Sequence, residues 1–153
     1  MNIVVVRPDG SFYTRPDTTL VRGARDYYLP DDLSSVTACR CRWISLKKSA
    51  KAVSARFSSR YYDAVGEGVL LYGEGGISYL DASTCIFPET RPAAALSEAE
   101  HARLAGTLEK VTRHQLLRLA DLVVFEEPGG ASLSRGETVD LYAGAPARCF
   151  KIC

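Results

Sequence analysis

The stretch that most narrows the possible folds of this chain is residues 36–46, VTACRCRWISL. Its β-branched and aromatic residues are typical of a strand, and successive side chains of a strand point to opposite faces. One face then carries Thr37, Cys39, Cys41 and Trp43, and the other carries Ala38, Arg40 and Arg42. Two thiols therefore lie side by side on one face of the predicted strand, with two guanidinium groups behind them.

Short apolar runs separated by turn residues continue along most of the chain. Pro8-Asp9-Gly10 predicts a turn, because proline presets φ and glycine accepts positive φ, so residues 1–15 are expected to form a hairpin. Residues 73–76 and 128–130 are expected to form a turn and a tight loop. The predicted strands are residues 3–6, 12–15, 27–29, 36–46, 69–72, 77–80, 121–125, 138–142 and 148–152.

One clear helix is expected over residues 97–117. Ser97 can cap it and Glu100 stands three residues later, which is the arrangement of a capping box. A second, poorer helical pattern covers residues 51–60. The 153 residues are enough for one domain with its own core and too few for two ordinary domains. The sequence therefore predicts a single β-rich α+β domain over residues 1–153.

The composition excludes several classes of protein. Lys and Arg number 19 and Asp and Glu 18, so the net charge is +1, whereas nucleic-acid-binding domains usually carry a marked basic excess. No apolar run approaches the length that spans a bilayer, so no membrane association is expected, and the expected location is the cytoplasm. The five cysteines are an odd number in a chain that is not small, so we expect them to be reduced.

No catalytic set can be assembled from the residues alone. His101 and His114 have no carboxylate at metalloprotease spacing, so no zinc helix is predicted. Cys39 and Cys41 lack the spacing and the second pair of a structural zinc site, although binding of a soft metal by these thiols stays open. The glycines of residues 66–76 match neither a P-loop nor a dinucleotide-binding fingerprint, and no serine lies in a nucleophile elbow.

Three segments of the chain resemble the fumarylacetoacetate hydrolase family. Residues 15–36, RPDTTLVRGARDYYLPDDLSSV, are similar to a Lys-Pro-Asp segment followed by two aromatics and Leu-Pro-Asp. Residues 55–69, ARFSSRYYDAVGEGV, are similar to the family's helix that ends in Arg-Tyr-Tyr-Asp and leads to a Gly-x-Asp strand. Residues 116–152 are similar to its C-terminal Gly-Asp-Leu-x-x-Gly-Thr-Pro run and final strands.

The resemblance implies a mixed β-roll, usually dimeric, and a site for Mg²⁺, Mn²⁺ or Ca²⁺ held by three carboxylates. The family's Glu-x-Glu falls on Cys39 and Cys41, its preceding histidine on Thr37, and its third ligand on Leu70. The threonine that holds the substrate's anionic group falls on Glu127. Thiols and a leucine cannot replace three oxygen ligands of a hard cation, so the resemblance implies that the metal ligands are lost and that no cofactor is bound.

Other departures from the family point the same way. The hairpin of residues 1–15 is expected to replace the family's lid segment, and the central region over residues 75–95 is expected to be shortened, so the roll would be truncated. Together these losses predict a pseudoenzyme that acts as a binding or assembly module, as a homodimer or in association with an active paralogue. The alternative is a metal-dependent hydrolase or decarboxylase of acylpyruvate-type keto acids with a rewired site. The sequence names no small-molecule ligand.

Overall fold

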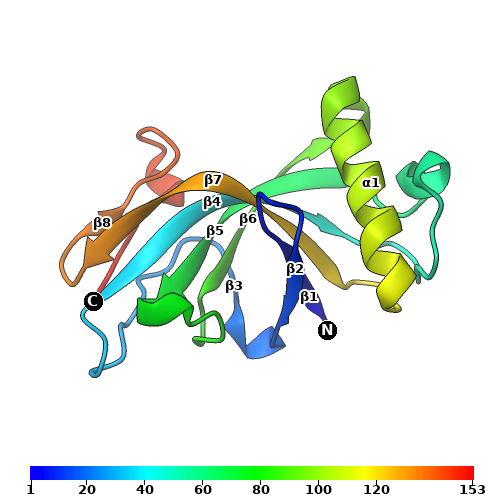
Figure 1. Cartoon of the computed structure of the whole chain (residues 1–153). Helices are drawn as coiled ribbons and strands as arrows, with labels where there is room; N and C mark the ends of the chain where they lie inside the picture. The colour runs from blue at the N-terminus through cyan, green and yellow to red at the C-terminus, as the bar shows by residue number, and fades with distance from the viewer.

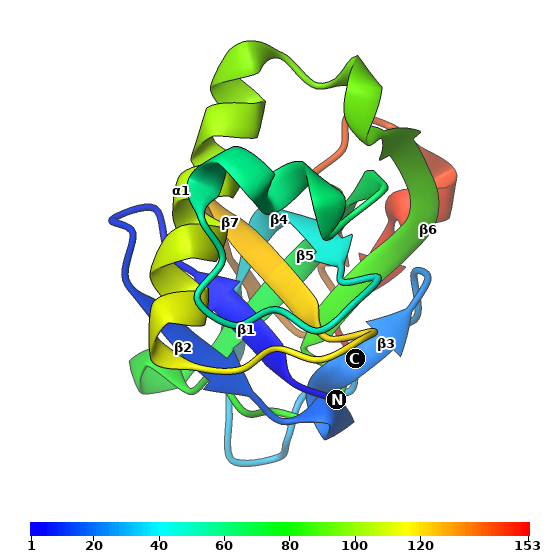
Figure 2. The same cartoon turned by 90° about the vertical axis from the view of Figure 1, so that its right-hand side faces the viewer.

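The computed structural model describes all 153 residues, and its main feature is one seven-stranded sheet that curls strongly (Figures 1 and 2). The order of the strands across this sheet is β2-β1-β7-β4-β5-β6-β3. Two short strands near the C-terminus, β8 and β9, form a second sheet. The strands are β1 Ile3–Val6, β2 Phe12–Arg15, β3 Leu20–Arg22, β4 Ser35–Ser45, β5 Ala64–Gly73, β6 Thr84–Pro92, β7 Leu122–Ser134, β8 Thr138–Val139 and β9 Phe150–Lys151.

The middle of the sheet is built on β4, which matches the strand predicted over residues 36–46 within one residue at each end. It pairs antiparallel with β5 on one side and with β7 on the other. The hairpin of β1 and β2 is confirmed, with Ile3 opposite Arg15 and Val6 opposite Phe12. Since β1 also runs parallel to β7, the N-terminal hairpin extends the central sheet.

The predicted strand over residues 77–80 is wrong. The antiparallel partner of β5 is β6, which pairs Leu70 with Thr84 and Val69 with Cys85. Residues 77–80 instead belong to a wide loop in which Gly75 and Gly76 have positive φ and Ser83 Oγ donates to the Leu80 carbonyl oxygen. This loop carries the chain from β5 to β6, so the return strand begins later than the glycines suggest.

The tight loop predicted at residues 128–130 is also wrong, because β7 runs through it as far as Ser134. The pairing with β4 shifts there: Cys41 lies opposite Glu126, but Cys39 lies opposite Gly130. The intervening residues form a β-bulge, in which the missing N–H of Pro128 breaks no regular ladder bond and Gly129 takes a φ of +87°. The bulge is the irregularity that positions Glu127.

The one α-helix, α1, spans Glu98–His114 and lies across one face of the sheet (Figure 2). Its capping box is formed as predicted: Ser97 Oγ accepts from the N–H of Glu100, and the Glu100 carboxylate accepts from the N–H of Ser97. The helix ends three residues before Leu117, because Leu117 instead pairs its backbone with Ala50. The poorer helical pattern becomes a 3₁₀ helix over Ala55–Arg60.

The two faces of the sheet bury three apolar clusters. We call the face that carries Cys41, Trp43 and Leu70 the inner face, because it lines the interior of the curl and holds one cluster. The other, outer face packs against α1 at the Ile44 end of β4 and against the C-terminal segment at the Val36 end. Arg40 and Arg42 lie on the outer face between these two clusters. None of the helices combines the length and the hydrophobicity that a bilayer-spanning segment requires.

Candidate functional site

The inner face brings together the three positions that the resemblance assigned to metal ligands. Cys39 lies directly opposite Leu70 in the pairing of β4 with β5, and Cys41 lies opposite Gly68. Cys41 and Leu70 are fully buried and pack with Ile3, Val5, Trp43, Ile86, Leu122 and Val124. Around Cys41 and Leu70 the inner face is therefore a packed apolar core.

The thiols of this face are neutral at ordinary pH. Burial, with a smaller effect of the nearby Glu126 carboxylate, raises the pKa of Cys39 to about 11. Burial likewise holds the pKa of Cys41 well above its usual range. The same cause raises the pKa of Cys85, which lies on the outer face with Val69 and Phe87, to about 12. A metal ligand must be a thiolate, so these thiols are poor ligands as they stand.

A hydrogen-bonded chain that the sequence analysis missed closes one end of the inner face. Arg15, only 1% exposed, donates from Nε to Tyr13 Oη at 3.0 Å. Tyr13 Oη donates to Tyr72 Oη at 2.7 Å, and Tyr72 Oη donates to the Glu126 carboxylate. The remaining Arg15 N–H groups bond to Ser83, Thr84 and the Leu71 carbonyl oxygen. The alternation of side chains along one strand cannot reveal these hydrogen bonds, because they join four strands through long side chains.

The outer face holds Glu127 and the two arginines of β4. Arg42 Nε lies 3.1 Å from Glu127 Oε1, and Arg40 Nε lies 3.4 Å from Glu127 Oε2. Arg42 also donates from Nη1 to the Glu100 carboxylate of α1, which Arg91 Nη2 approaches at 3.5 Å. The charges of β4 thereby connect the bulge of β7 to the first turn of α1.

A third carboxylate belongs to the same face. Glu67 of β5 is the cross-strand partner of Arg42, and its Oε1 lies 2.9 Å from Arg148 Nη1. The guanidinium of Arg148 also lies over the rings of Phe87 and Tyr142, at 5.3 and 5.1 Å from their centroids.

These contacts shift the pKa values of the outer face. The N–H of Ser97 and the hydrogen bond from Arg42 hold the pKa of Glu100 at about 2, below its usual value. Burial by itself would lower the pKa of Arg42, but Glu100 and Glu127 raise it overall. The pair of Arg42 and Glu100 therefore stays ionised across the ordinary pH range.

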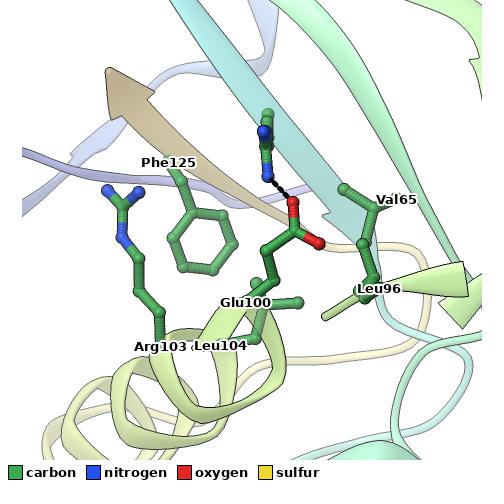
Figure 3. Close-up of a pocket in the computed structure, with 7 residues that line it drawn as sticks. Val65, Leu96, Glu100, Arg103, Leu104 and Phe125 are labelled. Atoms are coloured by element: carbon green, nitrogen blue, oxygen red, sulfur yellow. Dashed lines mark hydrogen bonds and ion pairs between the residues drawn. The ribbon is translucent and has the colours of Figure 1, made fainter. Parts of the chain in front are cut away.

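A small pocket opens beside this network, between the start of α1 and the sheet (Figure 3). Glu100 enters it from α1 and Arg103 flanks it on the other side of the Phe125 ring. Its volume is about 50 Å³, which is room for a few water molecules. The lining residues are Arg42, Val65, Leu96, Glu100, Arg103, Leu104 and Phe125.

The structure separates the two parts of the predicted site. Cys39, Cys41 and Leu70 lie on the inner face, whereas Glu127 points to the outer face with Arg40 and Arg42. No three side chains among the His, Cys, Asp and Glu residues come together in a way that could hold a metal ion. The residues present thus do not fit the divalent cation that the resemblance would imply, on either face.

The sequence matches no protein-family model and no curated protein. A fumarylacetoacetate hydrolase family protein from Yersinia pestis superposes with a TM-score of 0.80 at 15% identity, over 99% of this chain and 92% of that one. Fumarylpyruvate hydrolase from Pseudomonas aeruginosa, in complex with Mn²⁺ and pyruvate, superposes with a TM-score of 0.73 at 14% identity, over 90% of this chain and 82% of that one. Maleylpyruvate hydrolase from Sphingobium sp. SYK-6 superposes with a TM-score of 0.77 at 13% identity, over 90% of this chain and 63% of that one.

The architecture is that of an α+β protein built on one curled sheet with a single α-helix against it. More particularly, it is the fold of the fumarylacetoacetate hydrolase family, and the resemblance noted in the sequence is confirmed at the level of the fold. The chain spans less than two thirds of the length of the maleylpyruvate hydrolase. At these identities the likeness concerns the fold and not the activity.

Proposed function

We propose that this protein is a non-catalytic homologue of the fumarylacetoacetate hydrolase family. The observation that carries the proposal is that no three metal-ligating side chains converge anywhere in the chain. A hard divalent cation needs several oxygen ligands in one place. Without such a set, a keto-acid substrate has no Lewis acid to polarise its carbonyl group.

The small pocket beside α1 offers no room for a keto-acid substrate. Its volume of about 50 Å³ is far below the roughly 300 Å³ at which small-molecule sites usually begin. The charged groups at its mouth, Arg42 and Glu100, already neutralise each other.

The role proposed for such a protein is that of a binding or assembly module. We propose that it acts in the cytoplasm as a homodimer, or in association with an active paralogue, without a resident cofactor. The small near-neutral net charge of +1 is compatible with this role and gives no reason to invoke nucleic acid.

The alternative is a rewired enzyme, a hydrolase or decarboxylase of acylpyruvate-type keto acids. One observation favours it: Arg103 presents positive charge beside an apolar floor that includes Phe125, which suits a small carboxylate. A variant of this alternative uses Cys39 and Cys41 as ligands of a soft metal, for which both thiols would first have to lose their protons.

Titration with Mg²⁺, Mn²⁺ and Zn²⁺ tests the proposal when it is combined with assays of acylpyruvate cleavage and oxaloacetate decarboxylation. We expect no turnover with any of the three metals. Millimolar or tighter Mg²⁺ binding with turnover would overturn the proposal, and Zn²⁺ bound by both thiols would support the rewired variant. Light scattering after size-exclusion chromatography gives the oligomeric state; a strict monomer would exclude the homodimer.

A further inference from the structure

Residues 47–61, which we call the basic platform, carry charge of one sign only. No Asp or Glu occurs between Asp32 and Asp63, although the whole chain is nearly balanced at a net charge of +1. The cationic residues of that interval are Arg40, Arg42, Lys47, Lys48, Lys51, Arg56 and Arg60. The first three have carboxylate partners. The other four are exposed and take part in no ion pair of the chain.

Aromatic rings hold three of the unpaired cations in place. The guanidinium carbon atoms of Arg56 and Arg60 lie 4.4 and 4.5 Å from the centroid of the Phe57 ring. Lys48 Nζ lies 4.6 Å from the centroid of the Tyr61 ring. A guanidinium over a ring uses its flat face there and keeps its N–H edge for a carboxylate. The cations of the platform have therefore lost part of their freedom before any partner binds, which favours binding.

The backbone of the platform is fixed to α1, and Figure 2 shows it in teal beside that helix. The Ala52 N–H donates to the Thr112 carbonyl oxygen, and the Val53 N–H donates to Thr112 Oγ1 at 3.0 Å. The Ala55 N–H donates to the Glu109 carboxylate at 2.8 Å. The unpaired cations thus stand on a surface that is anchored by hydrogen bonds to the rest of the fold.

The carboxylates beside the platform already have partners. Asp63 Oδ1 lies 2.6 Å from Lys47 Nζ. Glu109 accepts from the Ala55 N–H and lies 3.5 Å from Arg113 Nη2. The positive charge of the platform is therefore left for a negatively charged partner to balance, and such a charge also speeds the encounter with that partner.

Two exposed leucines adjoin the platform. Ala50 and Leu117 form an antiparallel bridge, so the residues that flank them in the two segments lie side by side. Leu116 and Leu119, which are 46% and 65% exposed, belong to the segment across that bridge. Apolar side chains with charged residues around them are arranged as in a protein–protein interface, which has an apolar centre and a polar rim.

We propose that the basic platform and these two leucines form a docking surface for an acidic segment of a partner protein, with apolar side chains among its carboxylates. Nucleic acid fits this surface less well, because the half-buried rings of Phe57 and Tyr61 are occupied by cations and offer no platform for base stacking. A membrane surface fits less well because two leucines bury little apolar area in a bilayer. The proposal deepens the binding role proposed above and rests on that role for its biological meaning.

Fluorescence anisotropy with the full-length protein and a labelled peptide of repeated Glu-Glu-Leu tests the proposal. We expect saturable binding in about 50 mM NaCl and at least about tenfold weaker binding in about 300 mM NaCl, because salt screens exposed charges. A peptide of the same length made of repeated Gln-Gln-Leu is expected not to bind.

Arg56→Ala/Arg60→Ala is expected to weaken binding of the acidic peptide at least about tenfold, because two charge-assisted contacts are lost. Arg56→Lys/Arg60→Lys keeps the charge without the planar fork and is expected to lose less. The matched control is Arg22→Ala/Arg25→Ala, which removes the same charge from exposed arginines on and after β3 and is expected to keep the wild-type affinity. All these positions are exposed, so the thermal midpoints are expected to stay within about 2 °C of the wild type.

Leu116→Ser/Leu119→Ser tests the apolar part of the surface at unchanged charge. It is expected to weaken binding of the acidic peptide about fivefold, because apolar contacts at an interface contribute to affinity alongside the charges. Wild-type affinity in this variant would remove the leucines from the docking surface and overturn the apolar character proposed for the partner.

The proposal is overturned if the acidic peptide does not bind, if the Gln-Gln-Leu peptide binds as well, or if the control variant loses as much affinity as Arg56→Ala/Arg60→Ala. Tighter binding of single-stranded oligouridylate or of phosphatidylserine vesicles than of the peptide overturns it too. The enzyme assays are a separate test: turnover by the wild type would remove the non-catalytic role and leave the affinity for the peptide unchanged.

Discussion

The inner and outer faces of β4 show what one strand can do with alternate residues. On the inner face, Cys41 and Leu70 are fully buried in an apolar cluster and carry no charge. On the outer face, Arg40 and Arg42 meet Glu127 and take part in a connected set of ion pairs. Around Cys41 the inner face is apolar, whereas the outer face balances its charges in ion pairs. On neither face do three metal-ligating side chains come together.

The largest effect is expected when a carboxylate is placed on the inner face. Leu70→Asp puts a carboxyl group at a fully buried position, and an unpaired buried charge typically costs about 3–5 kcal/mol. Urea unfolding at pH 7 should show a loss of this size. Because the group can escape the penalty by binding a proton, the loss should shrink as the pH is lowered toward 5.

Leu70→Asn is the control for that change, since it has nearly the same shape as aspartate without the charge. It should be less destabilising and should not depend on pH between 5 and 7. A Leu70→Asp protein that is as stable as the wild type would show that the inner face admits water or an ion, and the contrast between the faces would fail.

A slightly smaller effect is expected from Gly68→Ala, which tests how closely the inner face is packed. A Cβ at Gly68 would lie 2.2 Å from the carbonyl oxygen of Cys85 and 3.2 Å from Cys41 Sγ. Backbone cannot yield as a side-chain tip can, so we expect a loss of about 3 kcal/mol in the free energy of unfolding. Gly106→Ala is the matched control: its Cβ would meet nothing within 4 Å, and alanine in α1 should stabilise by up to about 1 kcal/mol.

Much of this architecture could be predicted from local sequence signals. The alternation in residues 36–46 gave β4, the Pro8–Gly10 turn gave the N-terminal hairpin, and Ser97 with Glu100 gave the start of α1. The two wrong predictions concern where the chain reverses direction after a group of turn residues. Turn residues at 73–76 and 128–130 do not say whether a chain reverses at once, follows a wide loop or continues through a bulge.

The candidate site was harder to predict, because successive side chains of a strand point to opposite faces of the sheet. The positions assigned to metal ligands rest on aligning a Glu-x-Glu motif with a segment that retains neither glutamate. A shift of one residue in that alignment moves both positions to the other face, onto Ala38 and Arg40 or onto Arg40 and Arg42. Glu127 lies on that other face. Only tertiary contacts can therefore decide which face of β4 corresponds to the family's metal site.

A moderate effect is expected from acid, and it belongs to the outer face. The folded pKa of Glu100 is about 2, below the value of about 4.3 for an unfolded glutamate. A lowered folded pKa contributes stability that is complete above about pH 5 and is lost as the pH falls toward 2. Glu100→Gln should therefore lower stability at pH 7 and make its dependence on pH shallower between 5 and 2.

The control for the acid experiment is Glu98→Gln, which removes a charge from the same helical turn but from none of the ion pairs. It should keep the steepness of the wild-type acid profile. If Glu100→Gln left the acid profile unchanged as well, the ion pairs of the outer face would contribute little to stability.

The smallest perturbation is a chemical label on the cysteines. It tests whether the thiols of the inner face become accessible to solvent in the native protein. Cys39, Cys41 and Cys85 are buried and have raised pKa values, so at pH 7 they are protonated as well as inaccessible. Iodoacetamide should label only the two partly exposed thiols, Cys149 and Cys153, in the native protein. Mass spectrometry after timed quenching should show the other three labelled only in denaturant. Rapid native labelling of Cys39 and Cys41 would mean that the inner face opens to solvent, and the rewired thiol site would then become the better account of this chain.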